Sequence, residues 1–152
     1  MESDVVVRLG EPDDADTLAQ FNIAMARDTE DKRLDPPTVA QGVRAVLAHR
    51  EYGFYVVAAL GGEVVGSLLI TFEWSDWRSG LFWWIQSLYV KPDFRRRGVL
   101  KQLYRYVTAR ASRETNVCGI RLYAEQSNRV AHRAYTTLGM QKTNYHIYET
   151  MF

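Results

Sequence analysis

The sequence predicts a mixed α/β fold in which helices pack on a single sheet. Short apolar runs of strand length alternate with segments whose apolar residues recur at helical spacing. The Gly61-Gly62 pair separates two of these runs and permits the positive φ angles of a tight hairpin. Further along, a strand, a helix and a strand follow one another, which is typical of a crossover joining parallel strands. The expected order is β-α-α-β-β-β-α-β-α-β.

The N-terminal part predicts one strand and two helices. Val5–Val7 is a β-branched run of strand type. A helix follows over residues 13–27, and acids at its start complement the positive end of the helix dipole. Residues 28–35 form a polar connection. Asp35 followed by Pro36 signals the next helix, because aspartate caps the first turn and proline has the φ angle that this turn requires.

Three apolar segments in the middle of the chain predict an antiparallel meander. They cover Phe54–Leu60, Val64–Phe72 and Leu81–Val90, after Gly53 has ended the second helix. Residues 76–80 supply the turn between the second and third segments. The third segment is apolar on both faces, as expected of a central strand.

The C-terminal half predicts a helix, a strand, a helix and a last strand. The first of these helices has Leu100, Leu103 and Val107 as its core stripe and ends near Glu114. The remaining expected elements are a strand over Cys118–Ala124, a helix capped by Ser127 or Asn128 that reaches Leu138 and stops at Gly139, and a strand over Asn144–Thr150.

Composition narrows the class of protein. The 152 residues, 47% apolar and 24% charged, are those of one ordinary globular domain, which we expect to span residues 1–152. A single cysteine, Cys118, excludes an internal disulfide and a zinc site of several thiolates. No apolar run approaches the roughly 20 residues that a membrane span needs, and the acidic N-terminus does not read as a secretory signal. We therefore expect a cytoplasmic protein with no membrane partner.

The net charge of +1 hides an asymmetry along the chain. Residues 1–35 carry ten acids and four bases, whereas residues 91–133 carry eleven bases and three acids. This division indicates two different partners or two ends of one site. Solvated helix faces that happen to differ in sign are the alternative explanation.

Residues 88–103 carry the clearest chemical signal, because a strand there runs into a proline turn, a cationic glycine loop and a helix. The first N–H groups of a helix lack intrahelical acceptors, and the helix dipole favours an anion in front of them. Gly98 allows an anion to approach the backbone, while Arg95, Arg96 and Arg97 can donate to phosphate oxygens. The segment predicts a phosphate or pyrophosphate site, with a solvated basic run as the alternative. It lacks the motifs of a Walker loop or a dinucleotide fingerprint.

This loop resembles the acetyl-CoA signature of the GCN5-related N-acetyltransferases, whose pattern is Gln/Arg-x-x-Gly-x-Gly/Ala. Arg95, Gly98 and Leu100 stand at its three specified positions. The family pattern has Gly or Ala where this chain has Leu100, a departure that concerns the tightness of pyrophosphate binding rather than its location.

A second segment strengthens the resemblance. The family has an asparagine, a tyrosine seven residues later and then a glycine along its last helix, and Asn128, Tyr135 and Gly139 match that pattern. The two signatures stand in the family's order, and the resemblance covers essentially the whole chain. It implies the splayed central sheet of an acyl-CoA N-acyltransferase and acetyl-CoA as cosubstrate, with no metal. The implied cofactor-binding residues are Leu88, Tyr89, Val90, Arg95, Arg96, Arg97, Gly98, Val99, Leu100, Lys101, Asn128 and Tyr135.

The resemblance also implies a mechanism, the transfer of acetyl from the CoA thioester to a primary amine by direct attack. A main-chain N–H within Leu88–Val90 would polarise the thioester carbonyl. Tyr135 matches the family's general acid, which protonates the leaving thiolate. The amine must lose a proton, and Glu73 and Glu125 are the candidate carboxylates.

Each of these side chains also has an ordinary structural explanation. Tyr135 stands at helical spacing from other apolar residues, so it can be a core aromatic. Asn128 is a good helix cap whatever else it contacts. Glu73 and Glu125 are more often surface carboxylates than bases, and Cys118 fits a small buried apolar residue.

The acceptor end of the site is less specific in sequence. Aromatic side chains gather near the third and fourth strands, and acids gather near residues 28–35. Most of the aromatics should pack in the core, although aromatic faces also attract ammonium groups. An acidic rim suits a cationic amine. The region around Glu73 is similar to that of diamine and thialysine acetyltransferases, but Gln86-Ser87 replaces their acidic residues. The residues in question are Trp74, Trp77, Trp83, Trp84 and Tyr89, together with Asp28, Glu30, Asp31 and Asp35.

Four functions compete at this stage. The first is acetylation of a small-molecule amine. The second is acetylation of a protein or peptide, which needs an open groove. The third is noncatalytic acyl-CoA binding, which Leu100 favours and Tyr135 opposes. The fourth is nucleic-acid binding through the arginine run, which lacks the aromatic and basic interleaving of single-strand binders. We expect a small-molecule partner and no nucleic acid. Edge strands and tryptophans that we expect to be exposed also favour a homodimer.

Overall fold

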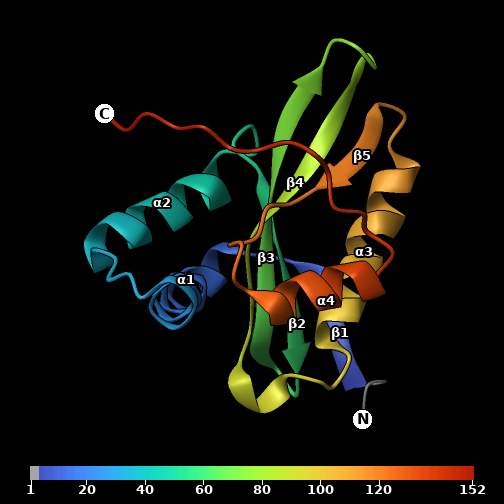
Figure 1. Ribbon diagram of the computed structural model, residues 1–152. Coiled ribbons are helices and arrows are strands. Elements are labelled where there is room, and N and C mark those ends of the chain that lie inside the picture. Colours follow the sequence, from blue (N-terminus) through green and yellow to red (C-terminus); the bar gives the residue numbers. More distant parts are fainter. Residues whose placement is uncertain (1–3) are drawn as a thin grey trace.

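The computed structural model describes residues 4–152 (Figure 1). Within these residues, five strands form one sheet in the order β1-β2-β3-β4-β5, accompanied by four α-helices and two short 3-10 turns. The elements in chain order are β1 (Val5–Leu9), η2 (Pro12–Asp14), α1 (Ala15–Glu30), α2 (Pro36–Ala48), β2 (Phe54–Leu60), β3 (Glu63–Ser75), β4 (Gly80–Val90), η3 (Pro92–Phe94), α3 (Val99–Arg113), β5 (Val117–Arg121) and α4 (Arg129–Thr137).

The pairing of the strands confirms the predicted topology of the sheet. β2, β3 and β4 pair antiparallel in sequence, and β1 adds to β2 in the same sense. β4 and β5 run parallel, so α3 is the connection that crosses between them. The predicted bounds of β2 agree with the structure, while β3 is longer than predicted and β5 is shorter.

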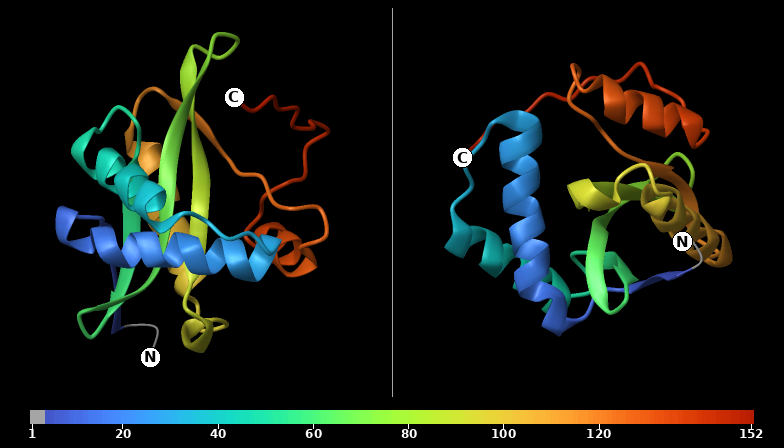
Figure 2. Two further views of the ribbon diagram at one scale, coloured as in Figure 1. Left: turned by 90° about the vertical axis from the view of Figure 1, so that its left-hand side faces the viewer. Right: turned by 90° about the horizontal axis from the view of Figure 1, so that it is seen from below.

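The sheet has helices on both faces, because successive side chains of β2 point to opposite sides. Tyr55 and Val57 are buried against α1 and α2, in a cluster with Leu18 and Val43. The alternate β2 residues are buried on the other face, among residues of α3. Figure 2 shows this division, with α1 and α2 on one side of the curved sheet and α3 on the other.

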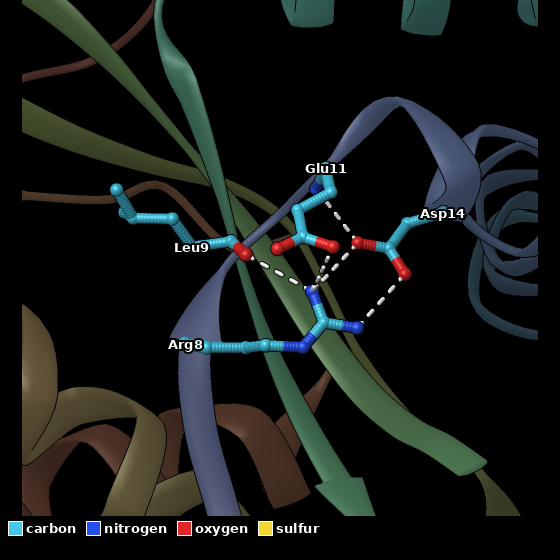
Figure 3. Close-up of polar contacts among 4 residues, drawn as sticks. All are labelled: Arg8, Leu9, Glu11 and Asp14. Carbon is cyan, nitrogen blue, oxygen red and sulfur yellow. Dashed lines mark hydrogen bonds and ion pairs between the residues drawn. The ribbon is translucent and has the colours of Figure 1, made fainter. Parts of the chain in front are cut away.

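An ion pair locks the start of α1 onto β1 (Figure 3). The Arg8 guanidinium donates to both Asp14 carboxylate oxygens, at 2.8 and 3.0 Å. The Asp14 carboxylate also accepts from the Glu11 main-chain N–H at 2.7 Å. The Arg8 guanidinium holds the pKa of Asp14 below its ordinary value, although burial acts in the opposite direction. This contact fixes the angle at which the chain leaves β1 and enters α1.

α3 packs on the sheet through Val99, a core residue that the sequence analysis did not predict. Val99, Leu103 and Val107 are buried, whereas Leu100 is only half-buried. The predicted stripe through Leu100 is therefore wrong by one residue at its start. Gly66 of β3 makes room for this first turn, since a Cβ there would stand 3.1 Å from a Val99 methyl and 3.2 Å from the Tyr89 carbonyl oxygen.

β4 bends beside the start of α3. Ser67 pairs with Tyr89 and Leu69 with Gln86, so two β4 residues stand opposite one β3 residue. Ser87, in this bulge, has a φ of 51°, an unusual value for a residue with a side chain. The pairing of β4 with β5 ends at Trp84, so the rest of β4 has no strand on that side among the described residues. The sheet is open there, as the resemblance implied.

Two further predicted elements differ from the structure. α1 continues to Glu30, three residues beyond the predicted end, and finishes at Asp31 in a left-handed conformation. The predicted strand over Asn144–Thr150 is wrong, because residues 141–152 are exposed and form no regular structure. Its residues favour a strand, but a strand also needs a neighbour to pair with, and this one has none among residues 4–152. No helix within residues 4–152 has the length and apolar character needed to cross a membrane.

Candidate functional site

The loop before α3 adopts the conformation of an anion cradle. Arg96 and Gly98 both lie in the left-handed region, with φ angles of 61° and 82°. Left-handed residues that alternate with other turn conformations can direct main-chain N–H groups toward a common point. Gly98 is the N-cap of α3, and glycine meets no steric penalty at such a φ. The arginine at position 96 bears that penalty, which is typical of functional loops.

The first turn of α3 has unpaired donors. Asp35 caps α2 and Asn128 caps α4 through side-chain oxygens, whereas Gly98 offers no side chain to α3. The first main-chain N–H of this helix to find an acceptor within residues 4–152 is that of Gln102, which donates to the Gly98 carbonyl. The preceding N–H groups point out of the helix, so an anion at this position would satisfy them.

The three arginines of the loop have different tasks. Arg95 donates to the Val90 carbonyl oxygen at 2.8 Å, and its guanidinium lies 5.5 Å from the centre of the Tyr89 ring. Arg97 donates to the Asp93 carbonyl oxygen at 3.4 Å and lies over Phe94. The exposed Arg96 side chain has no hydrogen-bond or ion-pair partner within residues 4–152. Arg95 therefore braces the loop against β4, and Arg96 is available to a ligand.

α4 carries the tyrosine of the second signature. The Asn128 side chain accepts from the Ala131 main-chain N–H at 3.1 Å, which confirms that it caps this helix. Tyr135 lies seven residues after Asn128, about two turns along the helix. Partial burial raises the pKa of its phenol above the ordinary value of 10.0. Its hydroxyl has no hydrogen-bond partner in the described part of the chain. The phenol is therefore protonated at neutral pH and has a proton to donate.

Glu73 is held by two donors from neighbouring strands. The Trp84 indole Nε1 donates to its carboxylate at 2.8 Å, and an Arg121 guanidinium nitrogen lies 3.1 Å from the same oxygen. Arg121 also stacks over the Phe82 ring at 3.6 Å, so it is itself fixed. Glu73 thus links β3, β4 and β5 where the three strands run side by side.

Glu125 shapes the turn between β5 and α4. Its carboxylate accepts from both the main-chain N–H and the hydroxyl of Ser127. These hydrogen bonds hold the pKa of Glu125 below its ordinary value, which makes it a weaker base. Its main-chain carbonyl lies 3.0 Å from a ring nitrogen of His132 on α4. The residue therefore ties the loop to the helix that carries Tyr135.

Comparison with known proteins agrees with this geometry. The Acetyltransferase (GNAT) family matches residues 18–140, which include the cradle, the bulged strand and α4. The chain belongs to the GNAT family of acetyltransferases. GNAT enzymes are N-acetyltransferases that use acetyl-CoA.

Solved structures of similar fold include a possible acetyltransferase from Clostridium difficile 630, which is 38% identical, with 97% of each chain covered and a TM-score of 0.91. A predicted acetyltransferase from Clostridium acetobutylicum, crystallised with acetyl-CoA, is 16% identical over 96% of both chains (TM-score 0.78). An aminoglycoside acetyltransferase from an uncultured soil metagenomic sample is 14% identical over 99% of this chain and 98% of that one (TM-score 0.78). The last two relatives show the fold alone.

The aromatic residues of this GNAT chain divide between core and surface. Trp83 and Tyr89 are buried and Trp84 is half-buried, whereas Trp74 and Trp77 are 59% and 85% exposed. The prediction that most of them pack in the core holds for β4 and fails for the β3–β4 hairpin. Exposed indole rings at a hairpin are free to contact a ligand.

The acids of the α1–α2 connection have mixed surroundings. Asp35 caps α2, and Asp28 and Glu30 pair with Arg27 and Lys32 at 3.2 and 3.3 Å. The exposed Asp31 has no such cation within residues 4–152. In both views of Figure 2, the C-terminal end of α1 and α4 lie on the same side of the molecule. The connection therefore places its carboxylates on the side of the GNAT fold that carries Tyr135.

Sequence reasoning missed the contact that one residue makes and the backbone conformation of another. Arg121 contacts Glu73, but a single arginine in a short strand carries no signal of its own. Ser87 takes the left-handed conformation of the bulge, for which only a glycine or asparagine would have been a sequence signal. The predicted Leu88, Val99 and Lys101 lie directly at the bulge or in the first turn of α3.

Proposed function

We propose that this enzyme transfers acetyl from acetyl-CoA to the primary amine of a small, cationic molecule. The observation that carries the proposal is the uncapped first turn of α3, preceded by two left-handed residues and flanked by the bulge of β4. A pyrophosphate would complete the hydrogen bonding of that turn. The unpaired stretch of β4 after Trp84 offers main-chain groups to the rest of an extended cosubstrate.

The proposed roles of the cradle residues follow from their contacts. The N–H groups of Val99, Leu100 and Lys101 would face the pyrophosphate, and Arg96 would add its guanidinium. Leu100 is half-buried and is not part of the buried core, so its side chain does not hold α3 away from the sheet. Gly66 of β3 lies against Val99 and allows the start of α3 to approach the sheet closely. The larger residue that this chain has at position 100 would therefore leave room for the pyrophosphate.

The proposed chemistry needs one acid and one base. The amine nitrogen attacks the thioester carbonyl carbon, a C–N bond forms, and the C–S bond breaks. A main-chain N–H near Leu88 would stabilise the charge that develops on the carbonyl oxygen. Tyr135 would give its phenolic proton to the departing sulfur. Glu73 would receive the amine proton, directly or through water, while Glu125 would keep its role in the turn.

The small-molecule acceptor is supported by charge and aromaticity. Exposed Asp31 ends α1, and the C-terminal end of α1 lies on the same side of the molecule as α4 (Figure 2). Trp74 and Trp77 are exposed near the β3–β4 hairpin. An ammonium group is attracted by both kinds of surface. A protein or peptide acceptor is the competing proposal, since the fold is common to enzymes with different acceptors.

A steady-state assay that measures CoA release tests the proposal. The panel contains small diamines, aminoglycosides and free amino acids, set against peptides with a lysine or a free N-terminus. We expect kcat/KM for at least one small amine to exceed that of every peptide by tenfold or more. Faster turnover of a peptide would show that the acceptor is a protein or peptide rather than a small molecule. Acetyl-CoA that neither binds nor turns over would overturn the whole proposal.

A further inference from the structure

The ion pair between Arg121 and Glu73 is incompletely closed. One guanidinium nitrogen, Nη1, donates to one carboxylate oxygen, Oε1, at 3.1 Å. The pair of Arg8 with Asp14, by contrast, uses two nitrogens and both oxygens, at 2.8 and 3.0 Å. Guanidinium and carboxylate groups fit each other through two parallel hydrogen bonds. The Arg121 pair therefore leaves hydrogen-bonding capacity unused on both partners.

The unused groups of this pair are open to a ligand. The Trp84 indole donates to the same Glu73 oxygen as Arg121, so the other oxygen, Oε2, has no donor within residues 4–152. The Nε and Nη2 groups of Arg121 have no acceptor in that part of the chain. The Glu73 and Arg121 side chains are 42% and 25% exposed. A free acceptor oxygen and free donor nitrogens thus lie close together at the surface.

Arg121 is held in place by aromatic rings rather than by a second acid. Its guanidinium carbon lies 3.6 Å from the centre of the Phe82 ring and 5.8 Å from that of Tyr145. The Phe82 ring in turn lies against Gly119 of β5, where a Cβ would stand 2.8 Å from it. Stacking fixes the guanidinium without using its N–H groups. Arg121 is therefore preorganised to donate to a further anion.

The open pair lies on the face of the sheet where the proposed acceptor would bind. Successive residues of β4 point to opposite faces, and Trp83 is buried on the α3 face. Phe82 and Trp84 therefore point to the face of α1 and α2 (Figure 2). Glu73 and Arg121 contact these two side chains, so they share that face with the acidic α1–α2 connection.

A second guanidinium lies near the same aromatic ring. Arg78, in the β3–β4 hairpin, has its guanidinium carbon 5.2 Å from the centre of the Phe82 ring. Its side chain is exposed, and among the residues that the structure describes no carboxylate pairs with it. An anion bound to Arg121 would therefore also attract Arg78.

We infer that the acceptor is a free amino acid with a cationic side chain and that Arg121 binds its carboxylate. The ammonium group and the carboxylate of an α-amino acid are separated by a single carbon atom, so they fit two neighbouring subsites. The ammonium group donates to Oε2 of Glu73. The carboxylate accepts from the free nitrogens of Arg121, with Arg78 beside it. The two charges of the amino acid thus complete the open ion pair.

This inference names the acceptor of the proposed function and rests on it. A basic amino acid keeps the net positive charge that suits the acidic α1–α2 connection. The proton that Glu73 receives in the proposed reaction then comes from the α-amine. A plain diamine would place a second cation beside Arg121 and leave the guanidinium without an anion, which disfavours it. Arg121 is therefore a specificity-determining residue.

Calorimetric titration of the enzyme saturated with CoA tests the inference without turnover. The ligands are L-lysine, L-ornithine and L-arginine, each compared with its α-carboxamide, which lacks the negative charge. We expect at least one amino acid to bind about tenfold or more tightly than its amide, because the amide cannot pair with Arg121. Amides that bind as tightly as the acids, or amino acids that do not bind, would overturn the inference and leave the acetyltransfer standing. Failure of CoA itself to bind would instead overturn the proposed function.

Matched variants then assign the carboxylate to Arg121. In Arg121→Gln the side-chain amide can still donate to Glu73, so far-UV circular dichroism should match that of the wild type. We expect this variant to lose the preference for the amino acid without weaker binding of the amide, and Arg121→Lys to recover part of the preference. Arg113→Gln, at the exposed end of α3, should keep the full preference. A preference that survives in Arg121→Gln would overturn the assignment.

Discussion

Single side chains of this enzyme owe their chemistry to what surrounds them. Burial keeps the Tyr135 phenol protonated, and the hydroxyl has no other partner among the described residues. Glu73 and Glu125 are both carboxylates near the ends of strands, yet one accepts from an indole and an arginine and the other from a serine. Asp14 is the most buried acid and serves the fold alone.

Removing the Tyr135 hydroxyl isolates the proposed acid. Tyr135→Phe should lower kcat by about 10²-fold, the usual contribution of general acid catalysis. Calorimetric titration should find acetyl-CoA affinity within about threefold of the wild type, because the cradle is untouched. Tyr52→Phe, at an exposed tyrosine next to His49, is the matched control and should change neither value. Equal kcat for the two variants would remove Tyr135 from the mechanism.

The two candidate bases can be separated by matched amide variants. In Glu73→Gln the remaining carbonyl oxygen still accepts from Trp84 and Arg121, so the fold should persist while the base is lost. We expect kcat to fall by about 10²-fold. Glu125→Gln should retain more than half of the activity, because its oxygen accepts from Ser127 in either form. The reverse order of effects would assign the base to Glu125.

Asp14 gives the protein a measurable dependence of stability on pH. Its folded pKa lies below the ordinary value of 3.8, so the Arg8 contact stabilises the fold fully above that value and is lost as pH falls through the folded pKa. Asp14→Asn should therefore lower the free energy of unfolding by about 1–3 kcal/mol at pH 7. The deficit should shrink as pH falls through the folded pKa of Asp14. Urea unfolding at several pH values measures it, and a deficit independent of pH would contradict this account.

Elements of the fold place the site by the way they begin and end. α2 and α4 start with side-chain caps, whereas α3 starts with Gly98 and unpaired N–H groups. β4 bends at Ser87, and β5 ends while β4 continues. In the proposed function, these irregular points, rather than the regular spans, would supply the room and the donors for an anionic cosubstrate.

The cradle can be tested at its glycine and its available arginine. Gly98→Ala forces a side chain into the left-handed region, at about 1 kcal/mol, and should weaken acetyl-CoA binding several-fold. Arg96→Ala should weaken acetyl-CoA binding more at low salt than at high salt, because salt screens the electrostatic interaction that this variant loses. Arg113→Ala, at the other end of α3, is the control. Calorimetry that finds all three variants alike would exclude the cradle as the binding site.

The sequence predicted the regular elements better than the irregular ones. Alternating and helical patterns located the meander, α3 and α4, and the glycine and proline signals marked most of their ends. The sequence carries no signal for the bulge at Ser87, because the φ angle of this residue depends on the strand register rather than on the residue type. Residues 144–150 have strand propensity, yet propensity cannot say whether a neighbouring edge is available. The contact between Arg121 and Glu73 could not be predicted, because it depends on how β3 and β5 lie in the folded sheet.

The whole molecule separates its tasks by region. α1 and α2 cover one face of the sheet and contribute the acidic connection, while α3, with the basic loop at its start, packs on the other face (Figure 2). In the proposed reaction, the acidic part of the chain would attract the amine and the basic part would bind the cosubstrate.

The position of the tryptophans gives this molecule an intrinsic optical signal. Trp74 and Trp77 are open to solvent on the hairpin, while Trp83 is 4% exposed and Trp84 donates its indole N–H to Glu73. Acrylamide should therefore quench two components of the fluorescence to different degrees, strongly for the hairpin tryptophans and weakly for those of β4. An amine that binds against the hairpin should protect the strongly quenched component and shift its emission to the blue. Acceptors can therefore be screened with unlabelled protein and no thioester present.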